Sequence, residues 1–110
     1  MPKPVAGRRA TRGCRVRSGL RAIAPLLATP RFEVIPTGSI EESVVEFVPP
    51  DVTVTVTASP NKGLEPTLDL VERLCARGYR VVPHVSARLV VDTAHLKEVV
   101  ERMVACGTTR

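Results

Sequence analysis

The segment Asp51-Val-Thr-Val-Thr-Val-Thr57 decides the fold, because valine and threonine alternate along it without a break. Both residue types are β-branched, and both suit the pleated surface of a sheet. The alternation predicts a strand at residues 52–57 whose three threonines share one face. Shorter apolar runs at residues 32–35 and 80–83 predict two further strands, one before and one after it.

Helical patterns follow each predicted strand. Ser39 and Glu42 form a predicted capping box at the start of the first helix. Gly78 suits the left-handed position that ends the second helix, and Asp92 or Thr93 is expected to cap the third. Strands separated by helices predict parallel pairing with right-handed crossovers, and therefore an α/β fold.

The length of 110 residues leaves room for one small domain, whereas a closed (β/α)8 barrel takes about 250 residues. The chain stops after the third helix, where a fourth strand would begin. We therefore predict that residues 31–110 form the N-terminal portion of an α/β barrel of TIM type, in the order β-α-β-α-β-α. No G-x-G-x-x-G or P-loop sequence follows any strand, which disfavours classical dinucleotide and nucleotide-phosphate folds.

Residues 1–30 form a basic extension that we expect to be largely disordered. They hold seven of the sixteen Lys and Arg residues and no acidic residue, so residues 31–110 carry a net charge of −2. Such a tail can target an organelle, bind nucleic-acid phosphates, or be a solvated leader without further function. We favour the solvated leader and expect no nucleic acid and no membrane partner, because the tail lacks aromatic residues and long apolar runs. Within it, residues 18–28 are expected to form a short helix that Pro25 interrupts.

The three cysteines, Cys14, Cys75 and Cys106, are far apart in sequence and show no C-x-x-C spacing. Small buried thiols in a reducing, cytoplasmic compartment explain them best. No cluster of cysteine and histidine has the spacing of metal ligands, so no metal site is predicted.

Each predicted strand carries one polar residue toward its C-terminal end: Glu33, Thr57 and His84. In α/β barrels the ligand chemistry lies at these ends. Glu33 is either a solvent-facing residue on an edge strand or a proton-donating carboxylate in a partly dry barrel mouth. Taken singly, Thr57 fits a merely polar strand face and His84 fits a structural hydrogen-bonding residue.

Taken together and in order, three segments resemble the N-terminal third of the methylenetetrahydrofolate reductase family: Phe32-Glu33-x-x-Pro36, Val54-Thr-Val-Thr57 and Pro83-His84. The resemblance covers about residues 31–110 and continues through Asp92-Thr-Ala-His-Leu-Lys-Glu-Val-Val in the last helix. It implies a barrel flavoprotein that binds FAD. Such an enzyme reduces 5,10-methylenetetrahydrofolate to 5-methyltetrahydrofolate with electrons from NAD(P)H, and a complete barrel is expected to form a homo-oligomer.

The resemblance also implies roles for individual residues. Glu33 would be the general acid that assists opening of the one-carbon bridge of the folate. Thr57 and Ala58 would lie near the flavin and nicotinamide, and His84 would contact the flavin. The chain departs from the family at Ala58-Ser59, where the family has an aromatic residue and a glycine. The alternative is a non-catalytic half-barrel remnant or interaction module.

Overall fold

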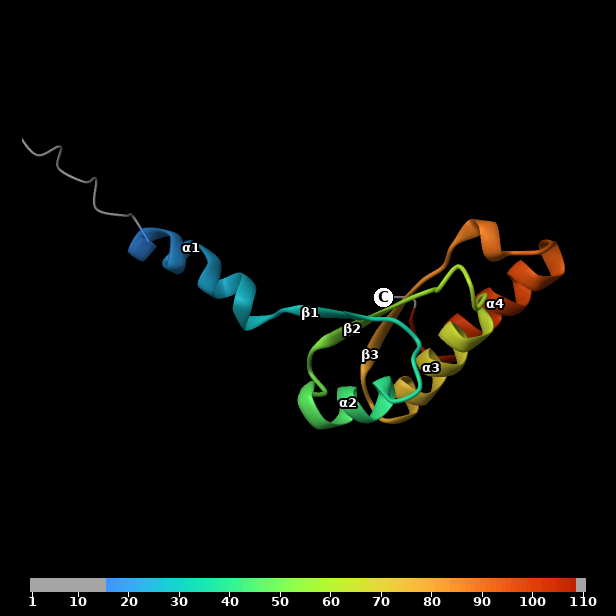
Figure 1. Cartoon of the computed structure of the whole chain (residues 1–110), viewed down its shortest axis with the longest axis horizontal. Coiled ribbons are helices and arrows are strands. Elements are labelled where there is room, and N and C mark those ends of the chain that lie inside the picture. Colours follow the sequence, from blue (N-terminus) through green and yellow to red (C-terminus); the bar gives the residue numbers. More distant parts are fainter. Residues whose placement is uncertain (1–15, 109–110) are drawn as a thin grey trace, which may run out of the picture.

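The computed structural model describes the backbone of residues 16–108 and the side chains of residues 21–108 (Figure 1). A short 3₁₀ helix, η1, precedes the last α-helix. In chain order the elements are α1 (Val16–Ala28), β1 (Arg31–Val34), α2 (Ile40–Phe47), β2 (Thr53–Thr57), α3 (Glu65–Ala76), β3 (Arg80–His84), η1 (Ala87–Leu89) and α4 (Thr93–Ala105).

The three strands form one parallel sheet in the order β1-β2-β3. Val54 of β2 lies opposite Phe32 of β1 and Val81 of β3. The predicted α/β fold, with parallel strands joined by helices, is therefore confirmed. The sheet is open, because within residues 16–108 β1 and β3 each pair with one neighbour only.

One face of the sheet is covered by helices. Val54 and Val56 are completely buried there, since α2 and α3 connect the strands on that side and pack their apolar stripes against it. Tyr79 closes one end of this core, and its hydroxyl donates to the Val48 carbonyl oxygen at 2.9 Å. The buried members of the core are Val44, Val48, Val54, Val56, Leu70, Val71, Leu74, Tyr79 and Val81.

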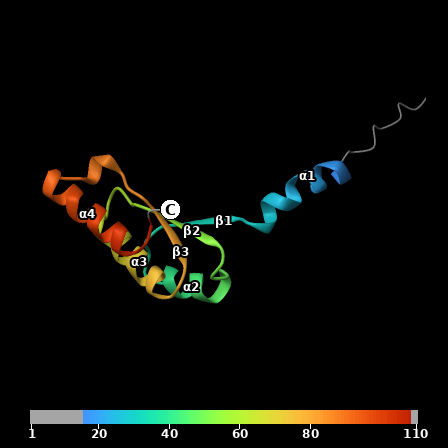
Figure 2. The ribbon, with the colours of Figure 1, turned by 180° about the vertical axis from the view of Figure 1, so that it is seen from behind.

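Helix α4 packs on α3 and extends the helical layer, as both views of the ribbon show (Figures 1 and 2). Leu64 and Leu68 of the α3 region bury Val99 of α4 between them. Arg102 then reaches back to three carboxylates of α3, with N–O distances of 2.5–2.8 Å. Apolar packing and charge thus hold α4 in one register along α3.

The predicted helix ends are partly right. Asp92 caps α4, because its carboxylate oxygen accepts the His95 backbone N–H at 2.7 Å. Gly78 adopts a φ of +88° after α3, as its predicted left-handed position requires. The predicted capping box at Ser39 is wrong: with φ −115° and ψ 12° the residue lacks the extended conformation that would aim its hydroxyl at the Glu42 N–H, and it makes no side-chain cap bond.

Helix α1 lies away from the sheet in both views, and its residues from Arg21 to Ala28 are exposed (Figures 1 and 2). The predicted helix over residues 18–28 is confirmed as α1, but the predicted interruption at Pro25 is wrong, because the helix runs through that residue. Pro25 lacks the N–H that would bond to the Arg21 carbonyl, but water can solvate that oxygen on an exposed helix. The expected disorder of residues 1–15 concerns a part of the chain outside the described residues.

Candidate functional site

Glu33, Thr57 and His84 lie on the face of the sheet that no described helix covers. Glu33 of β1 is paired in register with Thr55, and Thr57, the last residue of β2, is paired with His84, the last residue of β3. Because residues i and i+2 share a face and paired residues point the same way, all three side chains project from one side. The structure therefore brings these three predicted site residues together at the C-terminal ends of adjacent strands.

A short hydrogen bond joins two of them. The Thr57 hydroxyl donates to Glu33 Oε1 at 2.5 Å, across 24 residues of sequence. This contact runs diagonally, since Glu33 pairs directly with Thr55 and must lean toward the C-terminal ends of the strands to reach Thr57. The second carboxylate oxygen of Glu33 makes no hydrogen bond to the residues that the structure describes. Thr57 therefore orients the carboxylate and leaves one oxygen accessible.

Glu33 itself is exposed on an edge strand. Of the two environments that the sequence left open, this is the solvent-facing one. A dry barrel mouth would need further chain on the open side of β1, because three strands provide only one wall. Within residues 16–108, Glu33 therefore stands on one open face of a three-stranded sheet.

Ala58 is not brought to the same face as the other three predicted residues. Its half-buried methyl group packs against the cluster formed by Leu64, Leu68 and Val99, on the side of the helices. Only the backbone of Ala58 remains available to a ligand on the open face. The period of two along a strand explains this, because the residue after Thr57 points to the opposite side.

Lys62 is a residue at this end of the sheet that sequence reasoning missed. It lies in the loop after β2, and its ammonium group donates to the Pro36 carbonyl oxygen in the loop after β1 at 3.1 Å. It therefore ties together the two loops that border the candidate site and adds a positive charge there. The signal in the sequence that could have indicated this loop contact is a lysine directly before a glycine. In the structure that glycine, Gly63, has a φ of +75°, which allows the loop to turn.

His95, to which the sequence assigned no function, has a structural role at the start of α4. Its Nδ1 accepts the Val91 backbone N–H at 3.1 Å, and its Nε2 lies 3.8 Å from Glu65 of α3. Together with Asp92 it closes the turn between η1 and α4.

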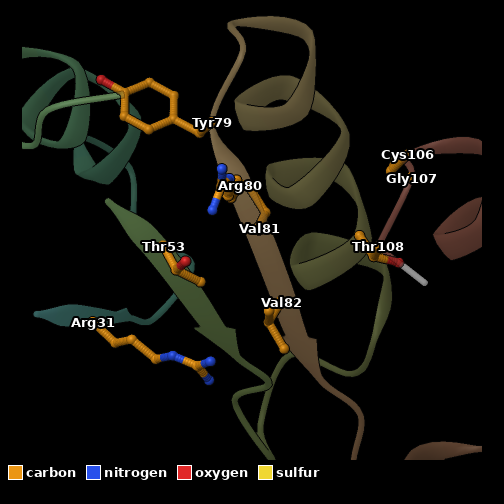
Figure 3. A pocket seen from close by; sticks show the side chains of 9 residues that line it. All are labelled: Arg31, Thr53, Tyr79, Arg80, Val81, Val82, Cys106, Gly107 and Thr108. Carbon is orange, nitrogen blue, oxygen red and sulfur yellow. The ribbon is translucent and has the colours of Figure 1, made fainter. Parts of the chain in front are cut away.

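The hollow shown in Figure 3, with a volume of about 530 Å³, lies at the other end of the strands. Arg31, Thr53 and Arg80, the first residues of their strands, line it together with the segment after α4. In Figure 3 the guanidinium groups of Arg31 and Arg80 lie apart from each other. Despite its size, this hollow contains none of the predicted site residues.

Across residues 16–108, no three His, Cys, Asp or Glu side chains gather in a way that would hold a metal ion. In the same region no helix has both the length and the apolar character needed to cross a bilayer.

Comparison with known proteins gives no relative: no family model, no curated protein and no solved structure matches this chain.

Proposed function

We propose that this chain is the N-terminal portion of a flavoprotein of the methylenetetrahydrofolate reductase type. Such an enzyme uses FAD and NAD(P)H to reduce 5,10-methylenetetrahydrofolate to 5-methyltetrahydrofolate. The observation that carries the proposal is the grouping of Glu33, Thr57 and His84 on the uncovered face, at the C-terminal ends of three adjacent parallel strands. Active sites of α/β barrels lie at this end.

In this proposal Glu33 donates the proton that assists opening of the one-carbon bridge. Its bond from Thr57 restricts the carboxyl group to one orientation and leaves Oε2 for the substrate. A positioned acid of this kind contributes about 10²–10⁴-fold to a rate. The solvent exposure of Glu33 is compatible with the role only when the remaining strands and the flavin exclude water from it.

The open face fits one side of a planar cofactor, since the polar side chains of Thr57 and His84 stand next to each other beside the half-buried Val82. FAD, when bound, supplies the hydride transfer between the nicotinamide and the folate. The residues of this chain would orient it: Thr57 and the Ala58 backbone at one edge and His84 at another. Half a site should bind weakly, with a dissociation constant on the order of 1 mM.

A titration of the 110-residue chain with FAD, followed by amide chemical shifts, tests the proposal. We expect shifts at Thr57, Ala58 and His84, and none at Arg31 and Arg80 at the opposite end of the sheet. His84→Ala should reduce the shifts at Thr57, while Arg80→Ala serves as the matched control and should leave them unchanged. Shifts confined to the Arg31 end, or none at millimolar FAD, would reject the flavin role.

The alternative, a non-catalytic interaction module, is favoured by one observation. The two outer strands have unpaired edges within the described chain, and Phe47 at the end of α2 is 73% exposed. Open strand edges promote association. Sedimentation at micromolar concentration should then show self-association, whereas a monomer with a cooperative thermal transition would remove this alternative.

A further inference from the structure

Helices α3 and α4 run side by side in the same direction, and one contact in each of three successive turns repeats at a nearly constant offset in sequence. Glu65 faces His95, Leu68 packs on Val99, and the Glu72 carboxylate accepts Arg102 Nε–H at 2.5 Å. The partners are 30 or 31 residues apart in each case. One register therefore holds from the start of α3 nearly to its end.

That register places two cysteines together. Seven residues, or about two helical turns, beyond Leu68 lies Cys75, and seven residues beyond Val99 lies Cys106. Both are half-buried free thiols that pack against the same core cluster. Burial, followed by the neighbouring Cys106 thiol, raises the pKa of Cys75 to about 11, as expected for two adjacent sulfurs.

The separation of packed helices suits a disulfide bond. Helix axes in contact lie about 8–10 Å apart, and each Cα stands about 2.3 Å from its axis, so facing Cα atoms approach to about 3.4–5.4 Å. Disulfides join Cα atoms about 4.4–6.8 Å apart. We propose that Cys75 and Cys106 form a redox-active pair. A small-molecule disulfide oxidises the pair to an internal disulfide bond, which links the C-terminal ends of α3 and α4.

The exchange proceeds in two balanced steps. The Cys106 thiolate attacks the small-molecule disulfide, which forms a mixed disulfide and releases one small thiol. The Cys75 sulfur then attacks Cys106 Sγ, so that the protein disulfide forms and the second small thiol leaves. The protein loses two protons and two electrons, and the reagent becomes two thiols. Cys106 acts first because burial disfavours the Cys75 thiolate.

The Cys75–Cys106 disulfide bond would restrain the segment that follows α4. Cys106 is directly followed by Gly107 and Thr108, which line the hollow beside β3 (Figure 3). Thr108 is already held by its hydroxyl, which donates to the Met103 carbonyl oxygen at 2.7 Å. An internal disulfide would add a covalent anchor one residue before this segment, and would so limit its motion at the open edge of the sheet.

The experiment uses the full chain with Cys14→Ser, which leaves two thiols, and oxidised glutathione as the reagent. We expect the mass to fall by two hydrogens, a proteolytic fragment that links Cys75 to Cys106, and a rise in Tm on the order of 10 °C. Dithiothreitol should reverse all three. In Cys75→Ser, Cys106 should instead keep one glutathione, and in Cys106→Ser the half-buried Cys75 should form its glutathione adduct more slowly, because burial raises its pKa.

A matched control moves one thiol by one position. Cys14→Ser/Ala105→Cys/Cys106→Ser moves the thiol from the half-buried position 106 to the exposed position 105, and glutathione adducts should replace the internal bond. Glutathione adducts on both Cys75 and Cys106, a disulfide-linked dimer, or no reaction of the folded chain would each overturn the proposal. So would equal linking of Cys75 to position 105 and to Cys106, because that would show a flexible chain rather than a fixed helix register.

Discussion

The two faces of the sheet differ in what lies against them, although the same three strands supply both. On the covered face, Val54, Val56 and Val81 are buried beneath α2 and α3. On the open face, Glu33, Thr57 and His84 stand free of any described helix. Residues one position apart in a strand therefore differ in their surroundings, because the apolar core lies on one side of the sheet and the proposed site lies on the other. Four changes test this division, beginning with the largest expected effect.

Substitutions on the open face should change activity more than stability. In a protein that continues this chain into a complete barrel, Glu33→Gln should slow the folate half-reaction by at least about 10²-fold, equivalent to about 2.7 kcal/mol. Flavin binding and its reduction by NAD(P)H should persist, because the change removes a proton and no cofactor contact. Stopped-flow measurement of the two half-reactions separates these effects. Equal loss in both would remove Glu33 from the role of proton donor.

Substitutions on the covered face should lower the free energy of unfolding. Val81→Ala should lower the free energy of unfolding by about 2 kcal/mol, because Val81 is only 4% exposed and its loss leaves a cavity in the core. Val82→Ala is the matched control on the next residue of the same strand, and should cost less than about 1 kcal/mol. Urea denaturation measures both. Equal losses would mean that something packs on the open face in solution.

The helical layer should depend on Arg102 at its outer edge. Its side chain is only 21% exposed and binds Glu65, Asp69 and Glu72, and their hydrogen bonds raise its pKa. Arg102→Met keeps the apolar stem and should cost about 1 kcal/mol, since the carboxylate partners are well exposed. Denaturation in low and high salt checks this, and a loss independent of salt would contradict an electrostatic origin.

The same substitution should change the dependence of stability on pH. Arg102 lowers the pKa of the Glu72 carboxyl below its unfolded value, chiefly through their hydrogen bond. The contribution of the ionised Glu72 carboxyl to stability is therefore complete above the pKa of the unfolded state, about 4.3. It is lost as pH falls through the lower pKa of the folded state. The difference between the parent and Arg102→Met should shrink on acidification. Remaining acid sensitivity should come from Glu41, whose pKa is lowered by Arg77 and Arg73. A difference that stays constant with pH would refute this linkage.

The smallest effect concerns a polar atom within the covered layer. Thr67 is completely buried in α3, and its hydroxyl finds no hydrogen-bond partner among the described residues. Thr67→Val keeps the shape and removes the unsatisfied group, so it should stabilise the chain by about 1 kcal/mol. Thermal denaturation measures the change. Destabilisation of similar size would reveal that the hydroxyl is bonded after all.

The local elements and their order follow from short segments of the sequence. The Val-Thr alternation produces β2 because β-branched residues favour an extended, pleated backbone. Gly78 ends α3 and Asp92 begins α4 for equally local reasons, namely a positive φ and a side chain within reach of a free N–H. The C-terminal positions of Thr57 and His84 followed directly from these elements, and with them most of the candidate site.

Which of these residues come into contact depends on the tertiary structure. The bond from Thr57 to Glu33 depends on the register of β1 against β2, and the pairing of Cys75 with Cys106 depends on how α4 packs along α3. Arg102 likewise binds three carboxylates that lie 30–37 residues earlier, on α3. Local propensity describes a periodicity within one element, whereas register between elements results from the packing of whole apolar faces, which no short segment contains.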